Sequence, residues 1–229
     1  MVLKNIIIKA IVSLSKALNL PERNYTYKPN RFLIVTPAGV GDTLWATPAI
    51  RALKETYPES YLGVLVTKTG SELLKGNPDI DELFIFKRSF KGFFSLPKLL
   101  KILRQRKFTV ALMFHAWDRM VWLICYFTGA GEIIGFKGTR GKRLDFILTK
   151  GITISDDINH WIDKYLSLVK ELKAFTSKKC IDIYLNNDDR IAVKKYFNDC
   201  GGCNDSLMVG LHPGGRHVYK LWNQRSFIQ

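Results

Sequence analysis

The feature that most constrains the fold is an alternation of short apolar runs with longer amphipathic stretches. Apolar runs of strand length lie at residues 32–36, 61–67, 83–86, 110–114 and 132–136. Helical spacing of apolar residues, with turn or cap residues at the ends, lies at 42–57, 71–75, 96–106 and 119–127. Strands that alternate with helices predict an α/β fold with a parallel sheet and crossover helices. Ligands of such sheets bind beyond the carboxyl ends of the strands. We therefore expect a Rossmann-like domain whose chemistry lies in the strand-to-helix turns.

A second domain of the same kind is expected to begin near the C-terminus. A helix from about His160 to residue 173 is followed by a polar stretch that contains a further helix at 188–198. Residues 207–211 then predict a new buried strand, and Asn223 resembles a helix cap. We divide the chain into an extension (1–30), a first Rossmann-like domain (31–185), a connection (186–205) and the start of a truncated second domain (206–229).

The charge of the chain points to an anionic partner. Hydrophobic residues make up 47% of the sequence, enough for a core, but the formal net charge is +15. Such a balance favours nucleic acid, an anionic membrane face or a phosphorylated substrate. We expect no nucleic acid, because no recognition motif or aromatic-interleaved sheet signature accompanies the charge. Two stretches concentrate the basic residues: Lys87, Arg88, Lys91, Lys98, Lys101, Arg104, Arg106 and Lys107 in the first, and Lys137, Arg140, Lys142 and Arg143 in the second. The first stretch is either an anion-binding surface or simply a solvated face. The second either binds an anionic ligand in the same way or faces anionic lipid.

Residues 1–20 have the pattern of a basic amphipathic helix. The segment has no signal-peptide cleavage pattern, and no apolar run reaches the roughly 20 residues that span a bilayer. It either lies on an anionic membrane surface or docks on the protein's own core. Four scattered cysteines are no disulfide framework, so a reducing compartment is expected. The CxxC spacing of Cys200 and Cys203 is interpreted as an incidental loop.

The turn after the first expected strand carries the main chemical candidate. Pro37-Ala-Gly-Val-Gly-Asp42 places two glycines before a helix N-terminus, where backbone can approach an anion. It is neither a phosphate-binding Walker loop nor a full dinucleotide fingerprint, because Leu44 stands where the third glycine would be. Asp42 is either the cap of the following helix or a general base at the mouth of the sheet. His115 and Asp118 follow the fourth strand, where they either bind polar groups of a ligand or pack in the loop.

Two ordered motifs resemble a known family. Gly39-Val-Gly-Asp-Thr-Leu-Trp-Ala-Thr-Pro-Ala-Ile-Arg-Ala-Leu-Lys54, followed by Pro58 and Asn77-Pro-Asp-Ile-Asp81, is similar to the opening signature of glycosyltransferase family 9, the ADP-heptose:lipopolysaccharide heptosyltransferases. Gly210-Leu-His-Pro-Gly-Gly215 and Lys220-Leu-Trp222 resemble the entry to the donor domain of that family.

The resemblance implies a two-domain GT-B enzyme that transfers a heptose or related sugar, with inversion and without metal, from an ADP-sugar to a phosphorylated lipid-linked acceptor in lipopolysaccharide core biosynthesis. It implies no cofactor besides the nucleotide sugar. The implied general base is Asp42. The residues expected at the donor are Gly41, Gly214, Gly215 and Lys220, although some members have hydroxyl side chains at the two positions corresponding to Gly214 and Gly215. Those expected at the acceptor are Lys87, Arg88, Lys91, His115 and Asp118.

The expected location is cytoplasmic, peripheral at the inner face of the cytoplasmic membrane. With the donor domain only begun, we expect this chain by itself to lack transferase activity. The alternative is a non-catalytic domain of the same fold that binds an anionic membrane or another polyanion.

Overall fold

The computed structural model describes residues 10, 12–13, 15, 22–26, 28–87, 90–115, 118–138, 142–155, 157–201, 209–214 and 221–227. At residues 90–94, 142, 143, 224 and 227 it describes the backbone alone. The chain separates into two compact units, Met1–Tyr184 and Leu185–Gln229, and each is described by itself.

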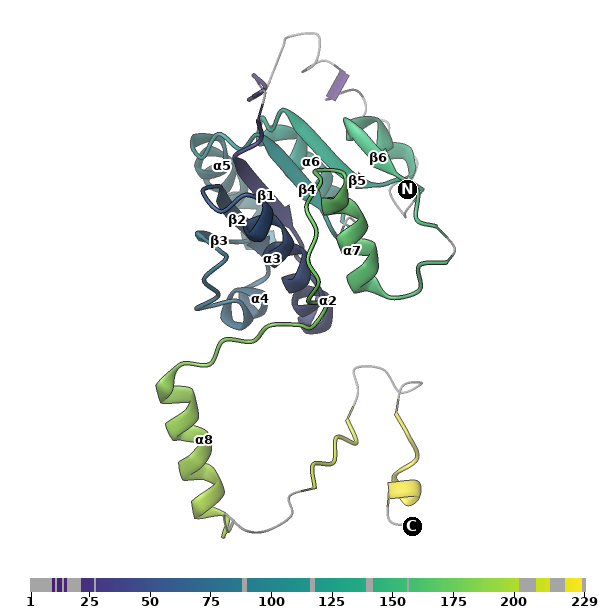
Figure 1. Cartoon of the computed structure of the whole chain (residues 1–229). Coiled ribbons are helices and arrows are strands. Elements are labelled where there is room, and N and C mark those ends of the chain that lie inside the picture. The colour runs from purple at the N-terminus through teal and green to yellow at the C-terminus, as the bar shows by residue number, and fades with distance from the viewer. Residues whose placement is uncertain are drawn as a thin grey trace. The chain divides into compact units, whose positions relative to one another are not determined.

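The first unit is built on a parallel sheet with the strand order β3-β2-β1-β4-β5-β6 (Figure 1). Its strands are β1 (Arg31–Val35), β2 (Tyr61–Val66), β3 (Glu82–Ile85), β4 (Val110–Met113), β5 (Glu132–Phe136) and β6 (Lys150–Ile152). All neighbouring strands pair in parallel, so the predicted α/β fold is confirmed. The edge strand β6 was not predicted, because three partly exposed residues carry too little apolar pattern to be recognised.

Helices cover both faces of this sheet (Figure 1). They are α2 (Val40–Trp45), α3 (Thr47–Thr56), α4 (Lys68–Leu73), α5 (Phe90–Gln105), α6 (Arg119–Phe127) and α7 (Trp161–Lys170), with a 3₁₀ helix η1 (Lys142–Ile147). Alternate residues of β1 enter two different cores, since successive side chains of a strand point to opposite faces. Leu33 and Val35 pack with side chains of α5 and α6, whereas Phe32 and Ile34 pack with those of α3 and α7.

The single helix expected over residues 42–57 is wrong, because it is two helices. α2 ends at Trp45 and α3 begins at Thr47. Pro48 has no N–H to donate to the carbonyl oxygen of Leu44, and its ring crowds that carbonyl, so the helical ladder breaks there. The Thr47 hydroxyl donates to the Leu44 carbonyl at 2.8 Å in place of the missing amide. Asp42, the candidate base, thus lies on a short helix that is separate from α3.

The N-terminal segment contacts the core of the first unit at the positions that are described. Val12 is fully buried and belongs to the core cluster of Val121 and Tyr126. The hydroxyl of Ser15 donates to the Tyr126 hydroxyl at 3.1 Å. Most of the amphipathic helix expected over residues 1–20 lies outside the described residues. At Val12 and Ser15, the core-docking alternative is the one observed.

The second unit contains the predicted helix near residue 188. α8 (Asn187–Asp199) begins with a capping box, in which Asn186 and Asp189 each accept a hydrogen bond from the other's backbone amide. Asn223 caps the short 3₁₀ helix η3 (Gln224–Phe227) by accepting from the Arg225 amide at 3.1 Å.

The buried strand expected over residues 207–211 is wrong at its described positions. Residues 209–211 have no regular secondary structure, and the side chains of Val209 and Leu211 are 75% and 69% exposed. A strand is stabilised by the neighbours with which it bonds. The described part of the second unit contains α8 and η3 and no strand to pair with.

Candidate functional site

The candidate site lies where the strand order reverses. β1 stands between β2 and β4, so the turns that leave β1 and β4 start side by side at the carboxyl edge of the sheet. The ladder continues just beyond the strands, where the amides of Phe114 and His115 both donate to the Val35 carbonyl, at 3.0 and 3.2 Å. A parallel sheet binds ligands at this reversal point. Asp42 follows β1, and His115 and Asp118 follow β4.

Asp42 lies in the first turn of α2, and its carboxylate is half-buried. The cap of this helix is Gly39, whose carbonyl accepts from the Thr43 hydroxyl at 2.9 Å. Within the described part of the chain, no group donates a hydrogen bond to the Asp42 carboxylate. The capping alternative for Asp42 is therefore wrong. A carboxylate without amide donors keeps its lone pairs for another partner.

One wall of the site comes from α7, far along the chain. His160 caps α7, its Nδ1 accepting from the Ile162 amide at 3.2 Å. An Nδ1 that accepts carries no proton, which leaves Nε2 as the donor of the neutral ring. This ring meets that of Trp45 of α2 in a T-shaped arrangement, with 5.5 Å between the centroids. The sequence singled out His160 as the start of a helix but gave no reason to place it against α2.

Tyr165 is the buried polar residue of this wall. Its ring is fully buried and stacks on Phe114, with centroids 4.7 Å apart and planes 13° from parallel. Its hydroxyl is buried and has no hydrogen-bond partner among the described residues. Burial raises the pKa of the Tyr165 phenol, and the negative charge of Asp42 raises it further. The Tyr165 hydroxyl thus lies within the electrostatic reach of the candidate base, a relation that no sequence motif predicted.

The structure describes some of the predicted acceptor residues with their side chains and others only in part or not at all. Lys87 is exposed directly after β3, at the same edge of the sheet as the Asp42 turn. Arg88 lies outside the described residues, and Lys91 is described by its backbone alone, in α5. His115 is half-buried after β4. Asp118 caps α6, where its Oδ1 accepts from the Met120 amide at 3.0 Å. The loop-packing alternative therefore accounts for one oxygen of Asp118.

The predicted donor residues divide between the two units. Gly41 is exposed and immediately precedes Asp42. A Cβ at Gly41 would approach nothing nearer than Trp45, at 3.9 Å, so close packing does not require glycine there. Gly214 is exposed in the second unit, while Gly215 and Lys220 lie outside the described residues. The donor assignments of all four residues stay predictions.

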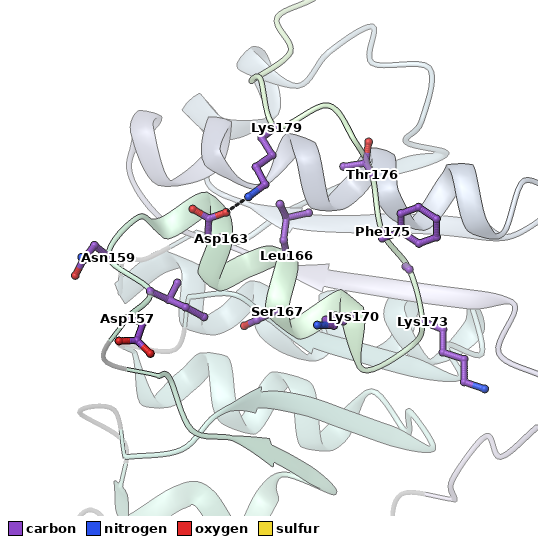
Figure 2. Close-up of a pocket in the computed structure, with 12 residues that line it drawn as sticks. Asp157, Asn159, Asp163, Leu166, Ser167, Lys170, Lys173, Phe175, Thr176 and Lys179 are labelled. Carbon is purple, nitrogen blue, oxygen red and sulfur yellow. Dashed lines mark hydrogen bonds and ion pairs between the residues drawn. The ribbon is translucent and has the colours of Figure 1, made fainter.

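A separate hollow of about 740 Å³ is lined by α7 and by residues of the segments just before and after it (Figure 2). Leu166, Phe175 and Ala174 give it an apolar lining, with Lys170 and Lys173 among its polar residues. An ion pair of 2.7 Å between Lys179 and Asp163 joins its two sides (Figure 2). None of the predicted site residues lines it.

Within the described residues, no helix is long and apolar enough to cross a membrane. No profile of a known protein family matches the sequence. The chain is 26% identical, over 204 residues, to lipopolysaccharide heptosyltransferase 3 of Escherichia coli K12, covering 82% of this chain and 55% of that protein.

Solved structures share the fold. The glycosyl transferase family 9 protein of Veillonella parvula superposes with a TM-score of 0.77 at 18% identity, covering 89% of this chain and 59% of its own. The ADP-heptose lipopolysaccharide heptosyltransferase II of E. coli superposes with a TM-score of 0.62 at 17% identity, covering 81% and 55%. The chain therefore spans little more than half the length of the proteins that it resembles.

Proposed function

We propose that this chain, whose resemblance to glycosyltransferase family 9 agrees with these relatives in sequence and in fold, is the acceptor-side part of a heptosyltransferase-like enzyme. The enzyme transfers a heptose or related sugar from an ADP-sugar to a phosphorylated, lipid-linked acceptor of the lipopolysaccharide core. The observation that carries the proposal is the half-buried Asp42 carboxylate, free of hydrogen bonds from described residues, at the reversal point of the sheet.

Asp42 acts as the general base in this proposal. Its carboxylate takes the proton of the acceptor hydroxyl while the hydroxyl oxygen attacks the anomeric carbon of the donor sugar. The new glycosidic C–O bond forms on the face opposite to the ADP, and the bond from the anomeric carbon to the diphosphate oxygen breaks. The electron pair of that bond leaves with ADP, so the configuration at the anomeric carbon inverts. The reaction uses no metal in this scheme.

The acceptor is held by charge at the rim of the sheet. Lys87, exposed beyond β3, supports this role, and Arg88 and Lys91 follow it in the sequence. Ammonium and guanidinium groups form strong, charge-assisted hydrogen bonds with phosphate oxygens. On the donor side, Gly41, Gly214 and Gly215 offer backbone amides to the diphosphate, and Lys220 offers a point charge.

We also propose that the protein makes a peripheral contact with an anionic membrane. The solvent side of α5 presents exposed Lys98, Lys101 and Arg104, and the net charge of the whole chain is +15. A lipid-linked acceptor is presented at a membrane surface, where basic side chains gain about 1 kcal/mol each from anionic lipids. The same charges support the competing function, a domain that binds polyanions without catalysis.

Replacement of the base separates the two functions. In the full-length protein, we expect Asp42→Asn to lower kcat for transfer from an ADP-sugar by about 10²–10⁴-fold, the usual contribution of a general base. The circular-dichroism spectrum should be unchanged and Tm should change little, because this half-buried carboxylate lies at the rim of the sheet and Asn has nearly the same shape. Asp157→Asn, an exposed acid on the α7 side of the unit, is the matched control and should retain activity. Full turnover by Asp42→Asn would refute the assignment, and a wild-type protein that binds anionic lipid but transfers no sugar would favour the polyanion-binding alternative.

A further inference from the structure

Two buried hydroxyls without partners lie in one layer at the candidate site. The Thr36 and Tyr165 side chains are fully buried, and neither hydroxyl has a hydrogen-bond partner among the described residues. More than nine in ten buried polar groups in folded proteins are hydrogen-bonded, so an orphan pair in one place calls for an explanation. An unsatisfied buried hydroxyl lowers stability.

The register of the sheet brings these two residues together. Val35 of β1 pairs with Met113 of β4, so Thr36 and Phe114 are the next residues in the same register. Phe114 packs in the core that contains Phe32 and Ile34, the face toward which Thr36, two residues beyond Ile34, also points. Tyr165 stacks directly on Phe114. The orphan hydroxyls therefore share the α7 side of the sheet, at the carboxyl end of its two central strands.

The same layer adjoins the helix of Asp42. Thr36 is separated from that helix only by residues 37–39, and Trp45 of α2 contacts His160 at the start of α7. Tyr165 lies one and a half turns further along α7 from His160. Burial is the main cause that raises the pKa of the Tyr165 phenol, and the negative charge of Asp42 adds to it. Among the described residues, the carboxylate of Asp42 accepts no hydrogen bond and the Tyr165 hydroxyl has no acceptor.

We propose that Tyr165 is a positioning residue, whose hydroxyl donates a hydrogen bond to the Asp42 carboxylate and fixes the orientation of the base toward the acceptor hydroxyl. A phenol O–H to carboxylate bond is charge-assisted and directional. It occupies one carboxylate oxygen and leaves the other to accept the proton. This bond offsets the cost of burying the Tyr165 hydroxyl, so removing the bond and the hydroxyl together should change activity far more than stability. The inference rests on the proposed base role of Asp42.

The first test needs no transferase activity. The chain is labelled with ¹³C at the ζ carbon of tyrosine, and the Tyr165 resonance is assigned by its absence in Tyr165→Phe. We expect Asp42→Asn to shift the Tyr165 resonance more than that of any other tyrosine, since the amide replaces a charged acceptor. Tyr57 is the internal reference, because its hydroxyl donates to the Leu172 carbonyl at 2.6 Å and not to Asp42. A Tyr165 resonance that does not respond to Asp42→Asn would overturn the proposal, whatever reaction the protein catalyses.

The second test compares two matched deletions of a hydroxyl. Tyr57→Phe removes a hydrogen bond that the fold uses and should lower Tm, whereas Tyr165→Phe should leave Tm unchanged or raise it. In the full-length enzyme, Tyr165→Phe should lower kcat about tenfold or more with KM within twofold, because a misplaced base loses rate without losing substrate. Adding Tyr165→Phe to Asp42→Asn should cause no further loss. A Tm drop as large as that of Tyr57→Phe, or additive losses in the double variant, would assign Tyr165 a structural role instead. Absence of transfer by the wild type would refute the proposed function and leave the resonance shift to decide this inference.

Discussion

The guanidinium of Arg51 on α3 holds the segment that leads out of the first unit. It donates to the carbonyl oxygens of Lys178 and Cys180, at 2.6 and 3.1 Å, and it forms an ion pair with the Asp182 carboxylate. The side chains of Arg51 and Asp182 are only 11% and 21% exposed. We expect Arg51→Met, which keeps an unbranched apolar stem and removes the guanidinium, to destabilise the first unit more than the loss of the other ion pair described on α3.

The magnitude follows from what the substitution leaves behind. Breaking one partner of a fully buried ion pair costs about 3–5 kcal/mol, because the remaining charge stays buried without compensation. The partial exposure of Asp182 places the expected loss at the lower end, about 3 kcal/mol. For a chain of this size that free energy corresponds to a fall in Tm of about 6–12 °C.

The control lies one turn away on the same helix. Lys54 donates to the Ser60 carbonyl at 2.6 Å and pairs with Asp81 at 2.9 Å, and the Asp81 side chain is 38% exposed. The Lys54 side chain is 16% exposed, but its partner carboxylate reaches solvent, which weakens the pair toward the roughly 0–1 kcal/mol of a surface pair. Lys54→Met should therefore shift Tm less than Arg51→Met, by a few degrees at most.

Thermal unfolding by circular dichroism measures both shifts, and amide hydrogen exchange locates them. The Asp182 amide donates to the Thr47 hydroxyl at 2.9 Å and should exchange faster in Arg51→Met. Equal Tm shifts for Arg51→Met and Lys54→Met, with the Asp182 amide still protected, would refute the reasoning.

Two further predictions concern pH and membrane binding. Hydrogen bonding by Arg106 is the main cause that lowers the pKa of Glu82, so this carboxylate stabilises the fold at neutral pH and loses that effect as the pH falls below about 4. Glu82→Gln should therefore lower Tm at pH 7 by a few degrees. The variant and the wild type should have the same Tm once the carboxyl of the folded wild type is protonated. An equal difference in Tm at all pH values would show that the ionised carboxylate is not the source of the stability. Neutralising Lys98, Lys101 and Arg104 together to Gln should weaken binding to vesicles of phosphatidylserine by about 100-fold, from about 1 kcal/mol per charge, with neutral vesicles as the control. Binding that survives all three changes would remove α5 from the membrane contact.

The sheet could be predicted from the sequence because its strands are buried on both faces. Segments such as Val110–Met113 and Glu132–Phe136 are near-continuous apolar runs between turn residues, and their predicted bounds agree with the structure to within a residue. The position of Asp42 followed from the same reasoning, since a turn after a central parallel strand must lie at the carboxyl edge.

The sequence pattern gave wrong predictions for the end of α2 and for its cap. Helical spacing extends across Pro48, but the missing N–H ends α2 at Trp45. Asp42 had the residue type of a cap, yet the chain places the cap three residues earlier, at Gly39. A cap is decided by which residue leaves the extended region last, and an acidic residue inside the first turn gives the same sequence pattern.

The α7 wall could not be predicted at all. Tyr165 and His160 read as ordinary members of an amphipathic helix, and only the crossover that returns α7 beside α3 brings them to the Asp42 helix. Tertiary contacts of this kind leave no periodic trace in one sequence. The role proposed for Tyr165 came from a hydroxyl without a partner among the described residues, which is a property of the fold and not of the residue type.

The break at Pro48 also separates two helices that should respond differently to substitution. A helix of six residues is too short to be stable by itself, so the place of α2 is set by what surrounds it. α3, by contrast, carries a fully buried face and the Arg51 anchor. Substitutions within α3 should then lower the stability of the fold. Substitutions in α2, or in the α7 residues that support it, should lower turnover in a protein that still folds. Pro48 thus marks the boundary between α3, which stabilises the fold, and α2, whose position depends on the fold around it.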